Sequence, residues 1–259
     1  MLRLLKTPKI QMAIALVLIF ATVFIRQPSS GIIFRFLLTL MLVVGVDILL
    51  LKIRRIDPFF PSAGIVSACI ISLLLAPNLP LEELLLTALL VLFSKHFFRI
   101  DKRHIFNPAA FGLFFASTLF NHDISWWGVS WQQINSQNLF LTFAFFILLT
   151  SGYVSVVKMR RTKIIISFFL TYILLNFFWS KNLAVFDPTV LFFTLVMLPE
   201  PMTTPNKPFT QILFGIFVAI ESMFFSSPIF SSKELISNLI PDPLIAALLV
   251  GNFVFFKFR

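Results

Sequence analysis

Ten apolar segments, each 14 to 19 residues long, follow one another along this 259-residue chain and leave only short connections between them. A helix needs about 20 apolar residues to cross the hydrocarbon core of a bilayer. Only 12% of the residues are charged, whereas a soluble domain carries about 25%. The sequence therefore predicts an all-α integral membrane protein with about ten transmembrane helices and excludes a soluble enzyme. The segments cover residues 10–25, 33–51, 58–76, 81–98, 107–120, 139–157, 164–180, 184–198, 208–226 and 242–256.

The basic residues predict the orientation of these helices. The chain holds 21 Lys and Arg against 11 Asp and Glu, and the basic residues lie in the connections, which indicates topology and not a nucleic-acid site. With a cytoplasmic N-terminus, 17 basic residues fall inside and four fall outside: Arg26, Arg35, Lys181 and Lys233. We therefore expect a bacterial cytoplasmic membrane protein with both termini cytoplasmic. The tryptophans then fall near the outer interface, as in an aromatic belt: Trp126, Trp127, Trp131 and Trp179.

The sequence predicts no metal site. Cys69 is the single cysteine, so the chain alone builds neither a disulfide nor a cysteine cluster. His96 and His104 are eight residues apart and lie on either side of a predicted helix end, which is not the spacing of two ligands on one helix face. We therefore expect Cys69 to be a packing residue.

The two halves of the chain share landmarks in the same order. Asp57-Pro58 and Asp187-Pro188 open the third and eighth segments, and each of these segments ends at a proline-rich break. Asn107-Pro108 and Asp242-Pro243 open the fifth and tenth segments. Five helices per half is an odd number, so the second copy is inverted, which predicts two five-helix repeats over residues 1–130 and 131–259. Each Asx-Pro pair is also an ordinary helix start, because Asx caps a helix and Pro fits its first turn.

The fifth, eighth and tenth segments are too short to cross a bilayer unaided. At 14 or 15 residues they extend ~21–23 Å, against a hydrocarbon core of ~30 Å. Short helices at corresponding positions of two halves indicate a binding site between them, where helix starts suit an anion or a flavin ring and broken ends suit a cation. We expect this site between the third, fifth, eighth and tenth segments. The residues predicted to bind a non-covalent flavin or an ion are Asn107, Pro108, Asp187, Thr203 and Thr204.

Four acidic residues make up the predicted ion path: Asp47, Glu200, Glu221 and Asp242. Asp47 and Glu221 lie within the second and ninth segments, where an ionisable side chain is costly and is therefore a functional hypothesis. Two alternatives remain open for them. Asp47 is near enough to Lys52 and Arg54 for a local ion pair, and Glu221 is near enough to the outer end of its helix to be an interfacial carboxylate.

Two motifs resemble a known family. Residues 102–112, Lys-Arg-His-Ile-Phe-Asn-Pro-Ala-Ala-Phe-Gly, are similar to the Asn-Pro-Ala signature of the NqrB/RnfD family. Residues 198–205, Leu-Pro-Glu-Pro-Met-Thr-Thr-Pro, and the later Phe-Gly at 214–215 are similar to that family's Asp-Pro-Val-Thr-Ser-Pro segment and its trailing Phe-Gly. The family comprises the flavin-bearing membrane subunits of sodium-pumping quinone reductases and of Rnf complexes. The resemblance covers essentially the whole chain and implies ten helices in two inverted repeats, related to urea channels.

One feature of the family is missing from this chain. Members of the family carry FMN esterified to a threonine in a Ser-Gly-Ala-Thr motif, in the outer loop after the fifth helix. The corresponding residues 121–138 contain no threonine, and Ser-Gly-Ala-Thr occurs nowhere in the chain. We therefore expect no covalent FMN, and the resemblance implies at most a non-covalent FMN or riboflavin, with Na⁺ or H⁺ as the transported ion.

The leading hypothesis is a membrane subunit of an ion-translocating electron-transport complex of NqrB/RnfD type. Such a chain depends on partners in the bilayer, either the other subunits of the complex or a separate flavoprotein reductase, because it has no nucleotide-binding domain of its own. Two alternatives remain. One is a stand-alone channel or transporter for a small polar solute, and the other is a flavin-free membrane scaffold of a reductase. A shared fold alone does not separate these functions.

Overall fold

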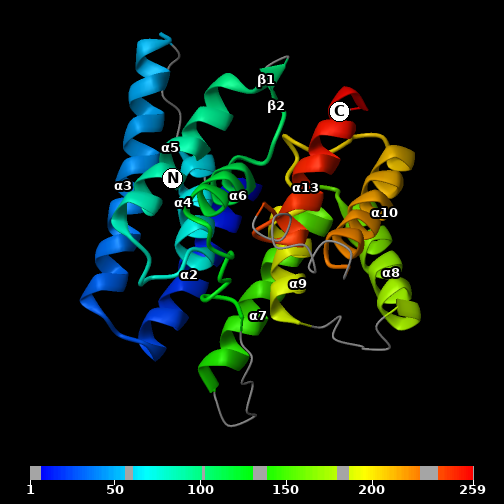
Figure 1. Cartoon of the computed structure of the whole chain (residues 1–259), viewed down its shortest axis with the longest axis horizontal. Helices are drawn as coiled ribbons and strands as arrows, with labels where there is room; N and C mark the ends of the chain where they lie inside the picture. Colours follow the sequence, from blue (N-terminus) through cyan, green and yellow to red (C-terminus); the bar gives the residue numbers. More distant parts are fainter. Residues whose placement is uncertain are drawn as a thin grey trace.

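The computed structural model describes residues 7–55, 61–100, 103–130, 139–179, 187–227 and 239–258, and within them the fold is all-α apart from one two-stranded hairpin (Figure 1). Two π-helical turns continue α-helices: η1 (Val154–Lys158) follows α7 and η3 (Phe193–Met197) follows α9. The α-helices are α2 (Pro8–Arg26), α3 (Ser30–Ile53), α4 (Ser62–Leu74), α5 (Leu81–Phe97), α6 (Pro108–Phe120), α7 (Leu139–Tyr153), α8 (Thr162–Trp179), α9 (Pro188–Phe192), α10 (Pro208–Phe225) and α13 (Pro243–Val254). A short 3₁₀ turn, η4 (Phe256–Phe258), ends the described chain.

The Asx-Pro pairs start helices as predicted. Proline occupies the first turn of α6, α9 and α13, and the preceding Asn107, Asp187 and Asp242 each accept a hydrogen bond from a backbone N–H two or three residues later. Such a cap satisfies an N–H group that has no partner inside the helix. The fourth pair, Asp57-Pro58, lies outside the described residues.

Three helices, α2, α3 and α10, are long and apolar enough to cross a membrane by length and composition. Large apolar side chains cover the outward face of α3, where Phe34, Leu37 and Met41 are each more than half exposed. Exposed apolar surface on this scale is unfavourable in water but suits a lipid environment. The helices therefore indicate membrane association.

Each predicted apolar segment contains a helix, but several helices are shorter than predicted. The fifth, eighth and tenth segments contain short helices, as the sequence suggests. The third does too, because α4 begins at Ser62 and ends at Leu74, within the predicted segment 58–76. Backbone N–H groups of the segment after α6 donate hydrogen bonds to the carbonyl groups at the C-terminal end of α4. The N–H groups of Ser125 and Trp126 donate to the Leu74 carbonyl, and the N–H of Gly128 donates to that of Leu73. A helix can end inside a membrane protein only where such partners are present.

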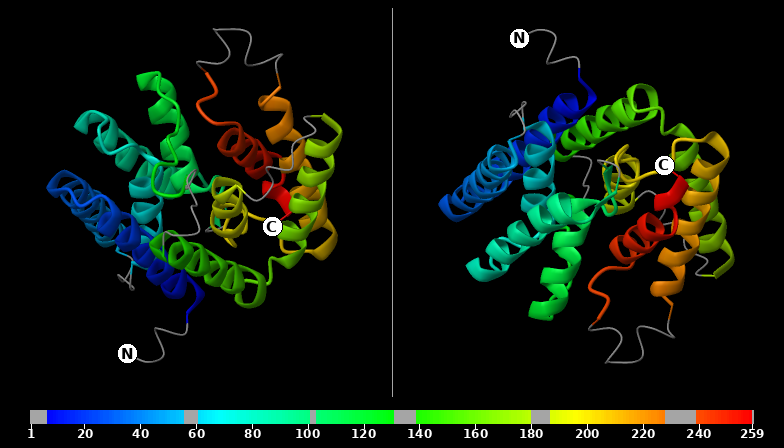
Figure 2. Two further views of the ribbon diagram at one scale, coloured as in Figure 1. Left: turned by 90° about the horizontal axis from the view of Figure 1, so that it is seen from below. Right: turned by 90° about the horizontal axis from the view of Figure 1, so that it is seen from above.

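Among the glycines that allow close helix packing, Gly112 and Gly251 have matching positions in the two halves. A Cβ on Gly112 of α6 would lie 2.7 Å from the Thr87 carbonyl oxygen of α5. A Cβ on Gly251 of α13 would lie 2.7 Å from the Val218 Cγ2 atom of α10. In each pair, α5 with α6 and α10 with α13, the two helices follow one another among the described helices and pack closely (Figure 2). In both panels of that figure α9 lies near the middle of the helix bundle.

The segment after α6 corrects the prediction of an aromatic belt. Trp126 is only 6% exposed, and its indole N–H donates to the Asp242 carboxylate at 2.7 Å. The Trp127 indole donates to the Ser72 carbonyl at 3.0 Å. These two side chains therefore join the segment to the ends of α4 and α13, because each has a buried hydrogen-bond partner there. Trp131 and the side chain of Trp179 lie outside the described residues.

A short hairpin replaces the plain inner loop expected between α5 and α6. Strands β1 (Arg99–Ile100) and β2 (Arg103–His104) pair in antiparallel register, Arg99 opposite His104. The hairpin lies at the upper edge of the molecule in Figure 1, close to the C-terminus. It turns the chain so that His104 and Asn107 approach the helix bundle.

Candidate functional site: a polar cavity at the Asn107 junction

Asn107 joins three parts of the chain through hydrogen bonds. Its side-chain amide donates to the Met197 carbonyl at the end of η3 at 3.2 Å, and its backbone N–H donates to the Asn252 side chain of α13 at 2.8 Å. The Asn252 amide donates in turn to the Thr203 carbonyl at 3.3 Å. Asn107 and Asn252 are both buried. The start of α6, the end of η3 and the last part of α13 therefore form one junction.

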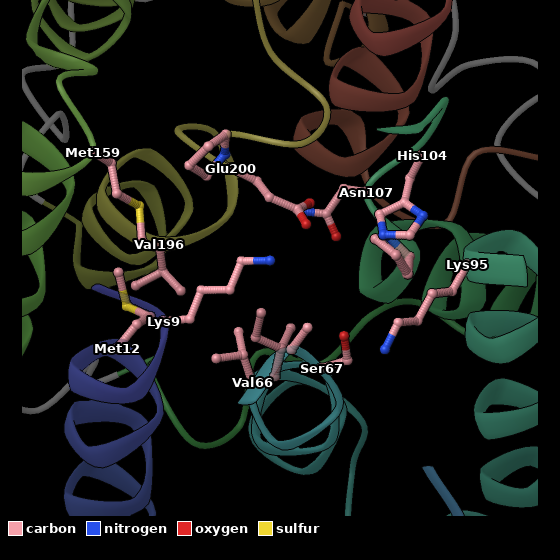
Figure 3. A pocket seen from close by; sticks show the side chains of 14 residues that line it. Lys9, Met12, Val66, Ser67, Lys95, His104, Asn107, Met159, Val196 and Glu200 are labelled. Atoms are coloured by element: carbon pink, nitrogen blue, oxygen red, sulfur yellow. The ribbon is translucent and has the colours of Figure 1, made fainter. Parts of the chain in front are cut away.

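A cavity of about 60 Å³ lies beside this junction (Figure 3). This volume holds several water molecules or one small polar group, because a single water needs about 10–15 Å³ measured in the same way. Lys9 of α2 and Glu200 extend into the cavity from different walls. Its lining residues are Lys9, Met12, Ala63, Val66, Ser67, Ile70, Lys95, His104, Asn107, Pro108, Met159, Val196, Glu200 and Pro201.

The cavity wall carries two positive charges and one negative charge, and the Asp47 carboxylate that pairs with Lys95 offsets the excess positive charge. Lys9 and Lys95 bring positive charge, and the half-buried Glu200 brings negative charge. His104 contributes none, because burial and the positive charges of Arg99, Lys95 and Lys9 lower its pKa to about 3. At neutral pH this histidine is therefore an uncharged wall residue. Such a cavity can exchange one cation for another or hold a small polar group without a large net charge.

Asp47 belongs to a buried cluster that reaches this cavity. Its carboxylate accepts a hydrogen bond from Lys95 Nζ at 2.6 Å and lies 2.9 Å from His96 Nε2. Arg54 donates to the His96 carbonyl at 3.1 Å. The partners of Asp47 thus come from α5 and not from Lys52 or Arg54 on its own helix, so the suggestion of a local ion pair is wrong. Asp47 extends from α3 towards α5 and pairs there with Lys95, which also lines the cavity.

The loop after η3 is held in a defined shape by Arg161. The guanidinium donates to the Pro205 carbonyl at 2.7 Å and to the Asn206 side-chain oxygen at 2.8 Å. Within the loop, the buried Thr204 hydroxyl donates to the Glu200 carbonyl at 2.7 Å, and the Thr203 hydroxyl lies 3.4 Å from the Glu200 carboxylate. Burial lowers the pKa of Arg161, with a contribution from the positive charge of Arg103. These bonds fix the backbone from which Glu200 extends.

Both π-helical turns border the cavity. Val196 lies in η3, and Met159 directly follows η1. The two turns are joined by a hydrogen bond from the Ser155 hydroxyl to the Leu195 carbonyl at 2.6 Å. Single π turns inside helices occur frequently at functional sites. Regular α-helical geometry is therefore interrupted beside the cavity, at this end of the bundle.

Five of the predicted site residues meet at this junction: Asn107, Pro108, Thr203, Thr204 and Glu200. Asp47 is linked to them through Lys95. The other three lie elsewhere. Asp187 is exposed at the start of α9, Asp242 caps α13 and binds Trp126, and Glu221 is half-buried on α10. The four-segment site predicted from the sequence also involves α2 and α5, which supply Lys9 and Lys95.

Lys9, Lys95 and Arg161 are not among the site residues predicted from the sequence. Each was counted only as part of the positive charge on the inner side. A signal was present for Lys95, because a lysine before the end of an apolar helix and an aspartate inside another form a plausible buried pair. For Lys9 and Arg161 no local pattern separates them from topology-determining residues.

No group of three or more His, Cys, Asp or Glu side chains gathers as a metal site in the described ranges. Comparison with models of known protein families and with curated protein sequences finds no match to this chain.

Proposed function

We propose that this chain is the membrane subunit of an ion-translocating electron-transport complex similar to the NqrB/RnfD family. One observation carries the proposal. The two segments that resemble that family, residues 102–112 and 198–205, are about 90 residues apart in the sequence, yet Asn107 and Pro108 line the same cavity as Glu200 and Pro201. Two motifs of one functional family are expected to meet at its site.

The proposal includes ten transmembrane helices arranged as two inverted repeats. The packing of the described helices supports this symmetry. In the first half α2 packs on α4, α3 on α5 and α5 on α6, and in the second half α7 packs on η3, α8 on α10 and α10 on α13. Between the halves, α2 packs on α7 and α6 on α13, which joins first helix to first and fifth to fifth. These pairings are consistent with a two-fold axis that relates the repeats, because such an axis exchanges the two helices of each pair between the halves.

The two ends of the bundle support the same symmetry. At one end the start of α6 binds the end of η3 through Asn107 and Met197. At the other end Asp242 at the start of α13 binds Trp126, whose backbone N–H donates to Leu74 at the end of α4. In each case the fifth helix of one half meets the third helix of the other. With the basic residues inside, the Asn107 end faces the cytoplasm of a bacterium, and both termini do too.

In this proposal Glu200 and the Asp47–Lys95 pair bind the transported cation, Na⁺ or H⁺, at the inner end. Displacement of Lys95 from Asp47 by a cation leaves the total charge of the site unchanged, which keeps the burial cost low. Glu221 and Asp242 lie in the other half of the path. Electrons come from partner subunits or a separate flavoprotein reductase. Cofactor pockets measure about 300–1,000 Å³, so this cavity does not fit a non-covalent FMN or riboflavin with its side chains as they stand.

A stand-alone channel for a small polar solute is the second candidate, and the size of the cavity favours it. A space of about 60 Å³ with balanced charge suits a small neutral molecule. Passive permeation requires neither an electron donor nor a partner, whereas ion pumping requires both. A flavin-free scaffold would require no transport at all.

The test uses the complex purified through an affinity tag on this chain and reconstituted in liposomes. Electron flow from the native donor should drive Na⁺ or H⁺ movement, and Glu200→Gln should abolish that movement. Glu82→Gln, which changes an exposed carboxylate on α5, is the matched control and should move ions like the wild type. Swelling of liposomes that hold the chain alone, in a small neutral solute without reductant, would establish the channel instead.

An absorbance spectrum of the purified chain, taken before and after acid precipitation, tests the cofactor directly. We expect no flavin in the precipitate, because residues 121–138 contain no threonine. Flavin in the supernatant would mean that a non-covalent flavin binds the chain outside this cavity or in a more open state of it.

A further inference from the structure

Glu83 is a buried carboxylate without a hydrogen-bond partner among the described residues. It lies in the first turn of α5, its side chain is 0% exposed, and neither carboxylate oxygen accepts a hydrogen bond from the described part of the chain. The neighbouring Glu82 is exposed. An ionised carboxylate in this position would be strongly unfavourable, because it has lost its hydration without gaining a hydrogen bond. The group must therefore hold a proton or bind a cation.

The surroundings of Glu83 are polar on one side only. Gly112 of α6 packs on Thr87 and Val91 of α5, and the two helices are antiparallel, so the turn of α6 that holds Ser117 lies beside the turn that holds Glu83. Ser117 is fully buried, and its hydroxyl also has no hydrogen-bond partner in the described ranges. Just after α6, His122 Nε2 lies 3.9 Å from Glu83 Oε2, and the side chain of His122 is 44% exposed.

We propose that Glu83, Ser117 and His122 form a proton-binding site, in which Glu83 holds the proton, Ser117 supplies a buried hydroxyl on the adjacent turn of α6, and His122 exchanges the proton with solvent. A proton neutralises the carboxylate without further ligands. Hard metal cations take six or more oxygen ligands, and Glu83 and Ser117 together offer three side-chain oxygens. The assignment does not rest on the proposed function, because it concerns proton occupancy and not transport.

Apart from His122, no charged group in the described ranges forms an ion pair with Glu83. From α3, Arg35 borders a small cavity that Leu84 also lines, but it makes no ion pair with Glu83. Helix α4 holds no charged residue, and its one titratable group is Cys69. Asp123 follows His122 and is exposed. The Asp47–Lys95–His96 cluster and the β1–β2 hairpin lie at the opposite end of α5, about 18 Å away along the helix at 1.5 Å per residue.

The test is labelling of the purified wild-type chain with N,N′-dicyclohexylcarbodiimide, which reacts with protonated carboxyl groups in apolar surroundings. Fragment masses distinguish Glu83 from Glu82. At mildly acidic pH we expect at least about tenfold more label on Glu83 than on Glu82, and the label should fall as the pH rises, because the reactive form carries the proton. Equal labelling of the two residues, or none on Glu83, would overturn the proposal.

Variants test whether Glu83 is the labelled residue, and added salts test whether it binds a proton or Na⁺. Glu83→Gln should remove the label and Glu82→Gln should keep it. His122→Ala should move the pH of half-labelling upward, because it removes a positive charge that favours the ionised carboxylate. An unchanged pH of half-labelling would contradict the role of His122. Protection of Glu83 by sodium chloride, but not by choline chloride at equal ionic strength, would replace the proton site by a Na⁺ site. The mapping of the wild type decides the case even if Glu83→Gln does not fold.

Discussion

Asn107 combines two roles in one side chain: its oxygen caps α6 by accepting from the Ala110 N–H at 3.1 Å, and its amide donates to the Met197 carbonyl. Asn107→Leu removes both bonds, and Asn107→Ser keeps a cap but is too short to reach Met197. We expect the Leu variant to lower the free energy of unfolding by about 2–4 kcal/mol. The loss in the Ser variant should be smaller by about 1–2 kcal/mol, because its cap remains. Thermal denaturation in detergent measures both. Equal losses would show that the cap contributes nothing, and a Ser variant as stable as the wild type would show that the Met197 bond contributes nothing.

Asp47 and Lys95 form the second residue-scale test, because each neutralises the other inside the bundle. The Asp47 side chain is 3% exposed and that of Lys95 is 14% exposed. Asp47→Asn leaves the lysine without its counter-charge and should destabilise the protein by about 3 kcal/mol. The double variant Asp47→Asn/Lys95→Gln should be more stable than Asp47→Asn alone. A double-mutant cycle of melting temperatures checks this, and strictly additive losses would mean that the two groups do not interact.

Helix packing is the next scale, and Gly112 is its clearest test. Gly112→Ala would bring a methyl group against the Thr87 carbonyl oxygen and the Val91 side chain, so α5 and α6 must separate. We expect a loss of about 1–3 kcal/mol in unfolding free energy. Gly45 of α3 has no atom within 4 Å of an added Cβ, so Gly45→Ala is a matched control that should not destabilise the protein. Similar melting temperatures for the two variants would contradict the close approach of α5 and α6.

At the scale of the whole molecule, inverted repeats require corresponding loops to face opposite sides of the membrane. The loop after α4 contains the exposed Asn78, and the loop after η3 contains the exposed Lys207. In a Cys69→Ser background, we expect a cysteine in place of Asn78 to react with an impermeant maleimide on intact cells, and a cysteine in place of Lys207 to react only after lysis. Reaction of both cysteines on intact cells would contradict the inverted-repeat topology.

The sequence by itself determined the helical class, the approximate position of each helix and the starts at Asn107, Asp187 and Asp242. These features are local, because an apolar run is continuous and a cap bonds an N–H group only two or three residues away. The sequence also pointed to Asn107 as a binding residue and to Glu200 as part of an ion path, but only the structure shows that both line one cavity.

Tertiary structure alone decided the partners of the polar side chains. Asp47 pairs with a lysine 48 residues later, and Trp126 binds an aspartate 116 residues later. Such pairs depend on how helices cross and on their rotation about their axes, which apolar sequences do not specify when nearly every face is hydrophobic. For the same reason Glu83 gave no sequence signal: only the packing of α6 against α5 separates this buried carboxylate from the exposed Glu82 beside it.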